Sequence, residues 1–294
     1  MSQPAHRQTW NGLAIEAADA PIGLLGIPFD NTASFRKGAA LAPARIRSIT
    51  PHIAPFTEEG MSLAACIRDY GDVIFDLDWI RYFGSVRRVA GEVLNHPFAI
   101  FLGGDHSVTI PLAEAFDQAH PTGFGIIHID AHTDLMDIFE GHQWSHACTA
   151  RRYLESKHLE SKHVTFIGIR SWLQEEIDIV RDRGIAVHTA RRIHQRGIAA
   201  TTADVIQQLA EVPAVYLTLD IDCLDPAFAP GTGTPEAGGL SSRELLELLH
   251  GLFAALPIHA MDVVEVSPPL DTADITSMAA IKVLYEVIGM VTQR

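Results

Sequence analysis

The chain has 294 residues, of which 47% are hydrophobic and 20% charged, as expected for a globular protein with a sizeable core. Its formal net charge of −14 argues against nucleic acid or an anionic membrane as partner and suits a small cationic ligand. Three widely spaced cysteines, Cys66, Cys148 and Cys223, argue against a disulfide framework or a zinc ribbon. With neither a leader-like N-terminus nor an apolar run of about 18 residues, we expect a cytoplasmic protein.

After an expected polar tail over residues 1–20, short apolar runs alternate with segments of helical spacing. The expected strands are 22–27, 67–74, 98–102, 125–129, 164–169, 185–187, 215–219 and 258–264, and the expected helices are 43–49, 79–94, 172–183, 203–209, 242–256 and 277–291. This alternation is typical of a parallel sheet covered by helices on both faces. Since no repeat or linker divides the chain, we expect one α/β domain over residues 1–294.

The segment 125–134 reads Gly-Ile-Ile-His-Ile-Asp-Ala-His-Thr-Asp and ends in three metal-ligand types spaced two apart. In an extended chain Asp130, His132 and Asp134 would project to one side, although the segment need not stay extended beyond Asp130. Two carboxylates converging with an imidazole repel each other or stay unsatisfied unless a cation lies among them. The segment therefore predicts part of a metal site.

Three other apolar runs also end in residues of this kind. His106 follows 98–102 and a Gly-Gly pair, Asp220 and Asp222 follow 215–219, and Glu265 follows 258–264. In an open parallel sheet, ligands bind beyond the carboxyl ends of the strands. We therefore expect all these side chains, with those of 130–134, at the same edge of one sheet.

Two imidazoles and four carboxylates exceed what one tetrahedral ion uses, which favours two divalent ions. The six expected ligands are His106, Asp130, His132, Asp134, Asp220 and Asp222. Oxygen-rich ligation without thiolate favours Mn²⁺, with Fe²⁺, Co²⁺, Ni²⁺ and Zn²⁺ as alternatives; Cys223 should face away if strand alternation holds. Two such ions lower the pKa of a shared water and clamp an electrophile, so the expected chemistry is hydrolysis. No nucleophile elbow or P-loop competes with this interpretation.

These motifs resemble those of the ureohydrolases, the family of arginase and agmatinase. The resemblance rests on Gly26-Ile27-Pro28-Phe29-Asp30, Gly103-Gly104-Asp105-His106-Ser107, Asp130-Ala131-His132-Thr133-Asp134, Asp220-Ile221-Asp222-Cys223-Leu224-Asp225-Pro226 and Pro230-Gly231-Thr232-Gly233-Thr234-Pro235-Glu236. It implies a three-layer α/β/α fold with a parallel sheet of about eight strands, two Mn²⁺ per subunit, and a homotrimer or homohexamer. The implied reaction is hydrolysis of a guanidino group to urea and an amine.

The resemblance also implies a role for each site residue. His106, Asp130, Asp134 and Asp220 would hold one ion, and Asp130, His132, Asp220 and Asp222 the other. Asp134 would additionally move the proton of the attacking water, and Glu265 would pair with the guanidinium of the substrate. His146 matches the proton-shuttling histidine, but Ala147 and Cys148 follow it where the family usually has glycine after the histidine, and His142 lies near enough to compete.

Agmatine, giving putrescine, is the expected substrate. Arginine is disfavoured as the substrate. Arginases read its amino acid end with an asparagine and acidic residues, and this chain has Met136 at the first place and Ser171, Trp172 and Leu173 at the second. Guanidinobutyrate, guanidinopropionate, a formimino compound, and a metal-binding relative without catalysis are the alternatives. Asp137 and Glu140, in the loop 136–144, either bind the distal ammonium of agmatine or are solvated and have no role in binding.

Overall fold

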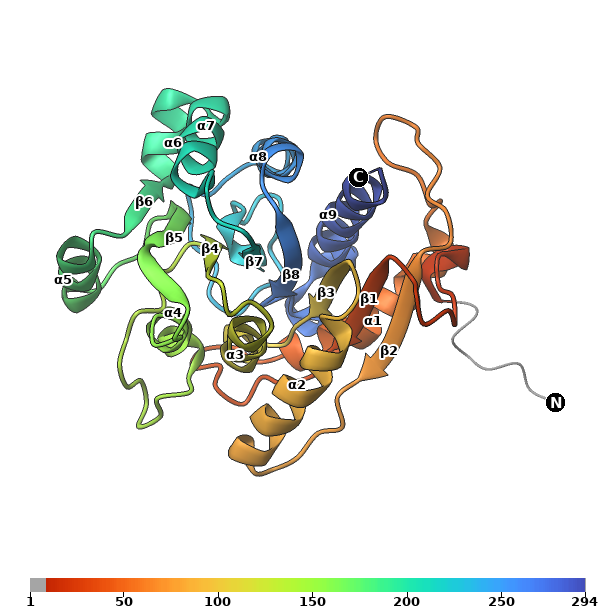
Figure 1. Ribbon diagram of the computed structural model, residues 1–294, viewed down its shortest axis with the longest axis horizontal. Helices are drawn as coiled ribbons and strands as arrows, with labels where there is room; N and C mark the ends of the chain where they lie inside the picture. Colours follow the sequence, from red (N-terminus) through yellow and green to blue (C-terminus); the bar gives the residue numbers. More distant parts are fainter. Residues whose placement is uncertain (1–8, 294) are drawn as a thin grey trace.

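The computed structural model describes residues 9–293 and places an eight-stranded, all-parallel sheet at the centre of the protein (Figure 1). The strand order is β2-β1-β3-β8-β7-β4-β5-β6. The strands are β1 (Ile22–Gly26), β2 (Ile67–Asp72), β3 (Phe98–Leu102), β4 (Phe124–Ile129), β5 (Leu159–Ile169), β6 (Ala186–Thr189), β7 (Val215–Asp220) and β8 (Ile258–Val264). Every predicted strand is therefore present.

Helices cover both faces of the sheet and complete the expected three-layer α/β/α architecture. The helices are α1 (Ala42–Ile49), α2 (Trp79–Val93), α3 (Thr109–Ala119), α4 (Thr149–Tyr153), α5 (Gln174–Arg183), α6 (Ala190–Arg196), α7 (Ile198–Leu209), α8 (Ser242–Ala255) and α9 (Ile275–Thr292). Alternate residues of each central strand point into two apolar cores: Phe98 and Ile100 of β3 pack with α8 and α9, whereas Phe101 packs with α2 and α3. Figure 1 shows these two helical layers on opposite sides of the sheet.

Local sequence signals explain where helix α8 begins and why helix α3 was not predicted. Ser241 and Glu244 form the capping box expected at the start of α8, each side chain bonding the backbone N–H of the other. Helix α3 was not predicted because it lacks a polar stripe: Ile110, Leu112 and Phe116 are all buried on it. It packs between α2 and α4, so burial on two sides removes the amphipathic period.

The N-terminal segment is more closely packed than the expected polar tail, and the C-terminal helix α9 is unusually apolar. Residues 1–8 lie outside the described part, but from Thr9 on the expected tail packs against the protein: Trp10 is fully buried and its Nε1 donates to Asp69 at 2.8 Å. At the other end, α9 is long and apolar enough to span a membrane by composition, yet 61% of its most apolar window is buried in the protein. Packing in the core accounts for its apolar character.

Candidate metal centre

Four neighbouring strands carry the predicted site residues to one edge of the sheet. β3, β8, β7 and β4 are adjacent in that order. His106, Glu265 and Asp130 follow β3, β8 and β4, and Asp220 is the last residue of β7. The carboxyl ends of parallel strands face the same way, so the side chains converge as expected.

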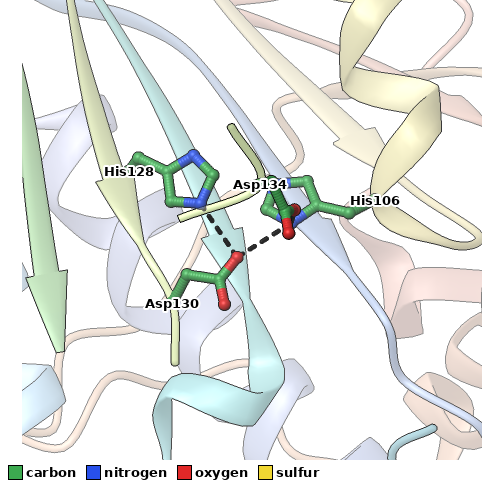
Figure 2. Close-up of side chains that lie close together, drawn as sticks. All are labelled: His106, His128, Asp130 and Asp134. Atoms are coloured by element: carbon green, nitrogen blue, oxygen red, sulfur yellow. Dashed lines mark hydrogen bonds and ion pairs between the residues drawn. The ribbon is translucent and has the colours of Figure 1, made fainter. Parts of the chain in front are cut away.

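His106 lies at the centre of the first ligand group. Its Nδ1 is 3.0 Å from Asp130 Oδ2, 3.1 Å from Asp134 Oδ2 and 3.2 Å from Asp220 Oδ2. All four side chains are nearly inaccessible to solvent. Figure 2 shows His106, Asp130 and Asp134 turned towards one another.

His132 organises the second ligand group, which shares Asp130 with the first. Its Nδ1 lies 3.1 Å from Asp222 Oδ2 and 3.4 Å from Asp130 Oδ1. Asp130 thus presents one oxygen to each histidine, Oδ2 to His106 and Oδ1 to His132. Asp130 is therefore the one carboxylate common to both ligand groups among the described residues.

The donor set fits cations better than it fits hydrogen bonding alone. Within residues 9–293, the buried atoms His106 Nδ1 and Asp222 Oδ2 have no hydrogen-bond partner. Burial, together with the charges of Asp222 and Asp130, raises the pKa of Asp220 well above its usual value. Buried carboxylates in this proximity repel one another, and divalent cations would relieve that repulsion.

His128 belongs to the site but was missed in the sequence. It lies on β4 two residues before Asp130, and its Nε2 is 2.9 Å from Asp130 Oδ2 (Figure 2). Its Nδ1 is 3.2 Å from the hydroxyl of Tyr153, which comes from α4. In the sequence, the one indication was a histidine within an otherwise apolar strand. The contact between His128 and Tyr153 could not be predicted without the fold.

The ligand segments converge through turns rather than through strand alternation. β4 ends at Ile129 and Asp134 adopts a left-handed φ of 52°, while 221–223 form a single 3₁₀ turn. The left-handed region is unfavourable for a non-glycine residue, so the surrounding contacts must hold Asp134 there. Cys223 packs within the apolar core and so faces away from the ligands, as expected. The cause is this 3₁₀ turn, however, and not the alternation of side chains along a strand.

Glu265 is the second site residue with a left-handed backbone, at φ 62°. Its Oε1 accepts a hydrogen bond of 2.8 Å from the backbone N–H of His106. Burial and the charge of Asp105 raise the pKa of Glu265 well above its usual value. A cation next to this carboxyl would compensate the cost of burying its charge.

These groups open into one cavity of about 230 Å³. Its lining includes His106, His132, Asp134, Asp220 and Glu265, and also His146. His142 does not line it; the centroid of that imidazole lies 4.6 Å from the centroid of the Trp79 ring, which is tilted by 35° to it, and His142 faces a separate cavity. Of the two histidines left open by the sequence, His146 is therefore the one placed beside the ligands.

Comparison with known proteins agrees with this geometry. A model described as the arginase family matches residues 20–289. The chain belongs to the arginase family. A guanidinobutyrase from Pseudomonas aeruginosa is 34% identical over 93% of this chain and 86% of its own, and an agmatinase from Salmonella dublin is 36% identical over 92% and 87%. The structure of an agmatine ureohydrolase from Thermoplasma volcanium, 31% identical, superposes with a TM-score of 0.86 over 100% of this chain and 96% of that one.

The outer wall of the cavity in this arginase-family hydrolase is lined mainly by apolar side chains. Met136, Phe139, Trp172 and Leu173 make that wall largely apolar, and the described lining residues include no lysine or arginine. Nearby Arg170 is not among them; it donates to backbone carbonyls, including those of Asp222 and Glu236, each at 2.7 Å.

The two acidic residues considered from the sequence also lie outside this cavity. Asp137 pairs with Arg152 at 2.5 Å, and Glu140 faces the neighbouring cavity of His142.

Proposed function

We propose that this protein hydrolyses a guanidino compound to urea and an amine with two Mn²⁺ ions, and that agmatine is its preferred substrate, giving putrescine. One observation carries the proposal: a buried carboxyl with no cationic partner among the described side chains, Glu265, lines the same cavity as two ligand groups that share Asp130. A planar cation bound to Glu265 would lie directly beside the ligands.

The six predicted ligands remain our assignment for the two ions. His106, Asp130, Asp134 and Asp220 would hold one, and Asp130, His132, Asp220 and Asp222 the other. Bound divalent ions supply a water that is readily deprotonated at neutral pH. Oxygen and imidazole donors without thiolate suit Mn²⁺.

The protein side chains supply orientation and proton transfer. Glu265 would bind the guanidinium and hold its plane towards the attacking water, which is the positioning contribution to catalysis. Asp134 would accept the proton of that water. His146, in contact with Thr32 Oγ1 at 3.4 Å and Ser34 Oγ at 3.4 Å, would move a proton between the amine product and solvent.

The apolar wall favours a substrate without a distal carboxylate. A carboxylate entering the cavity would lose its hydration without gaining a charged partner, because Arg and Lys are missing from the described lining. The distal ammonium of agmatine can instead lie against the aromatic faces of Trp172 and Phe139. Guanidinobutyrate is the second candidate, supported by the similarity to the Pseudomonas guanidinobutyrase.

A panel of guanidino compounds tests the proposal. The Mn²⁺-loaded protein should release urea from agmatine faster than from guanidinobutyrate or guanidinopropionate, and slowly from arginine. Release of formamide from a formimino compound, without urea from any of the others, would replace the guanidino assignment. No turnover with both ions bound would favour the non-catalytic relative.

Assembly and location also stay predictions. We propose a cytoplasmic homotrimer or homohexamer with neither nucleic acid nor a membrane as partner. Light scattering of the purified protein would give the number of subunits.

A further inference from the structure

Asp262 is a fully buried carboxyl behind the candidate metal centre. It lies on β8, is 0% exposed, and forms no ion pair within residues 9–293. Three hydroxyls donate to it instead: Tyr216 to Oδ2 at 2.7 Å, Thr109 to Oδ2 at 2.8 Å and Thr218 to Oδ1 at 2.6 Å. Neutral hydroxyl donors therefore satisfy this buried carboxyl in place of a cation, two of them at Oδ2 and one at Oδ1.

Thr218 connects this carboxyl to a predicted metal ligand. Its Oγ1 lies 2.9 Å from Nε2 of His106, on the opposite side of the ring from the carboxylate cluster. A hydroxyl has one proton to donate, and Thr218 directs it to Asp262. Its oxygen can then only accept from His106, so Nε2 must carry the proton of the imidazole.

We propose that Asp262 is a positioning residue that acts through Thr218 to fix the tautomer of His106. With Nε2 protonated, the lone pair of Nδ1 faces Asp130, Asp134 and Asp220, where it can ligate a metal ion. Histidine ligands are commonly held by a hydrogen bond from their other nitrogen to a carboxylate or carbonyl. Here a threonine hydroxyl is inserted between the carboxylate and the ring.

The direction of the hydrogen bonds makes this proposal testable. In Asp262→Asn, the amide oxygen can keep the bonds from Tyr216 and Thr109 while the amide nitrogen faces Thr218. That nitrogen would donate to Thr218 Oγ1, whose proton would turn towards Nε2 of His106. The ring would then need its proton on Nδ1, which blocks ligation, although size and burial are unchanged.

The experiment is a Mn²⁺ titration of the metal-free proteins, followed by the EPR signal of free Mn²⁺. Asp262→Asn and Thr218→Val should bind one of the two ions about 10- to 100-fold more weakly. Thr218→Ser keeps the hydroxyl and should restore the affinity. Tyr216→Phe removes a donor to Asp262 that does not contact His106, and should bind both ions within about threefold of the wild type.

A merely structural role for Asp262 makes different predictions. If Tyr216→Phe weakens Mn²⁺ as much as Asp262→Asn, or if Thr218→Val binds both ions normally, the proposal is wrong. Should Asp262→Asn fail to fold, the Thr218→Val and Thr218→Ser pair decides alone. The proposal rests on the metal site of the proposed function but not on the substrate, because Mn²⁺ affinity is measured without turnover: absence of urea would leave it standing.

Discussion

Glu265 and His106 are joined by a hydrogen bond of 2.8 Å from the backbone N–H of His106 to Oε1 of Glu265. One residue follows β8 and the other the neighbouring β3, so the bond ties together the ends of two adjacent strands. It fixes the carboxylate proposed to bind the guanidinium relative to a proposed metal ligand. The proposed guanidinium-binding group and the proposed metal ligand are therefore held in fixed positions relative to each other.

Glu265→Gln should abolish turnover while leaving metal content intact. The amide oxygen can still accept from the His106 N–H, but the neutral side chain cannot pair with a guanidinium, which should reduce kcat/KM by roughly 100-fold or more. Bound Mn²⁺, measured by elemental analysis, should stay at the wild-type level. Loss of the metal in this variant would show that Glu265 acts as a ligand or supports one.

Asp130→Asn should weaken both ions, because Asp130 faces both ligand groups. His132→Asn is the matched control, since His132 belongs to only one group, and it should retain one ion. The measurement is the number of Mn²⁺ bound by each variant at stoichiometric concentration. Two ions retained by Asp130→Asn would contradict its assignment as a bridge.

His146→Asn should lower kcat by about 100-fold, within the usual range for loss of an acid or base catalyst. His142→Asn offers the control, since His142 lies in the same loop but faces the neighbouring cavity. Its kcat should change by less than about threefold. The reverse order would identify His142 as the shuttle, and equal losses would indicate damage to the loop instead.

Leu173→Arg should shift preference towards guanidinobutyrate. Leu173 lines the outer wall and is 48% exposed, so an arginine there can reach a distal carboxylate without being buried. One charge-assisted hydrogen bond, roughly 1.5 kcal/mol, would raise the ratio of kcat/KM for guanidinobutyrate over agmatine about tenfold. Ile177→Arg, on α5 but outside the described cavity lining, should leave the ratio unchanged; an equal shift there would indicate a general charge effect.

Asp69 should contribute stability that is lost in acid. Burial alone would raise its pKa, but the hydrogen bonds and charge of Arg47, at 2.7 Å, outweigh burial and hold the pKa below its usual value. A lowered folded-state pKa stabilises the protein above the unfolded value, about 3.9, and the benefit fades as pH falls through the folded value.

Asp69→Asn should therefore destabilise the protein by about 1.5–3 kcal/mol at neutral pH, because the charge-assisted hydrogen bonds from Arg47 are weakened while Arg47 keeps its ion pair with Asp72. Its Tm should approach that of the wild type as pH falls below about 4. Glu92→Gln, in an exposed pair with Arg88, is the control and should change Tm little at any pH. A difference for Asp69→Asn that does not depend on pH would show that packing, not charge, holds it.

The sequence alone identified the six expected ligands and Glu265, but not His128. Two local patterns show why: the apolar run of β3 followed by two glycines and His106, and the Asp-x-His-x-Asp segment after β4. Such patterns involve only neighbouring residues, so they can be recognised in the sequence. The eight strands were predicted for the same reason: a buried parallel strand is a short apolar run whatever its neighbours are. The helix α3 was missed where that reasoning fails, because burial on two sides removes its period.

Only the tertiary structure decided how those residues meet. The adjacency of β3, β8, β7 and β4 arises from long crossovers, which leave no periodic trace in the chain. The contact from Tyr153 to His128, the apolar wall with Trp172, and the path from Asp262 through Thr218 to His106 each join segments distant in sequence. Residue identity can be read locally, whereas the direction of a hydrogen bond depends on the neighbours that folding supplies.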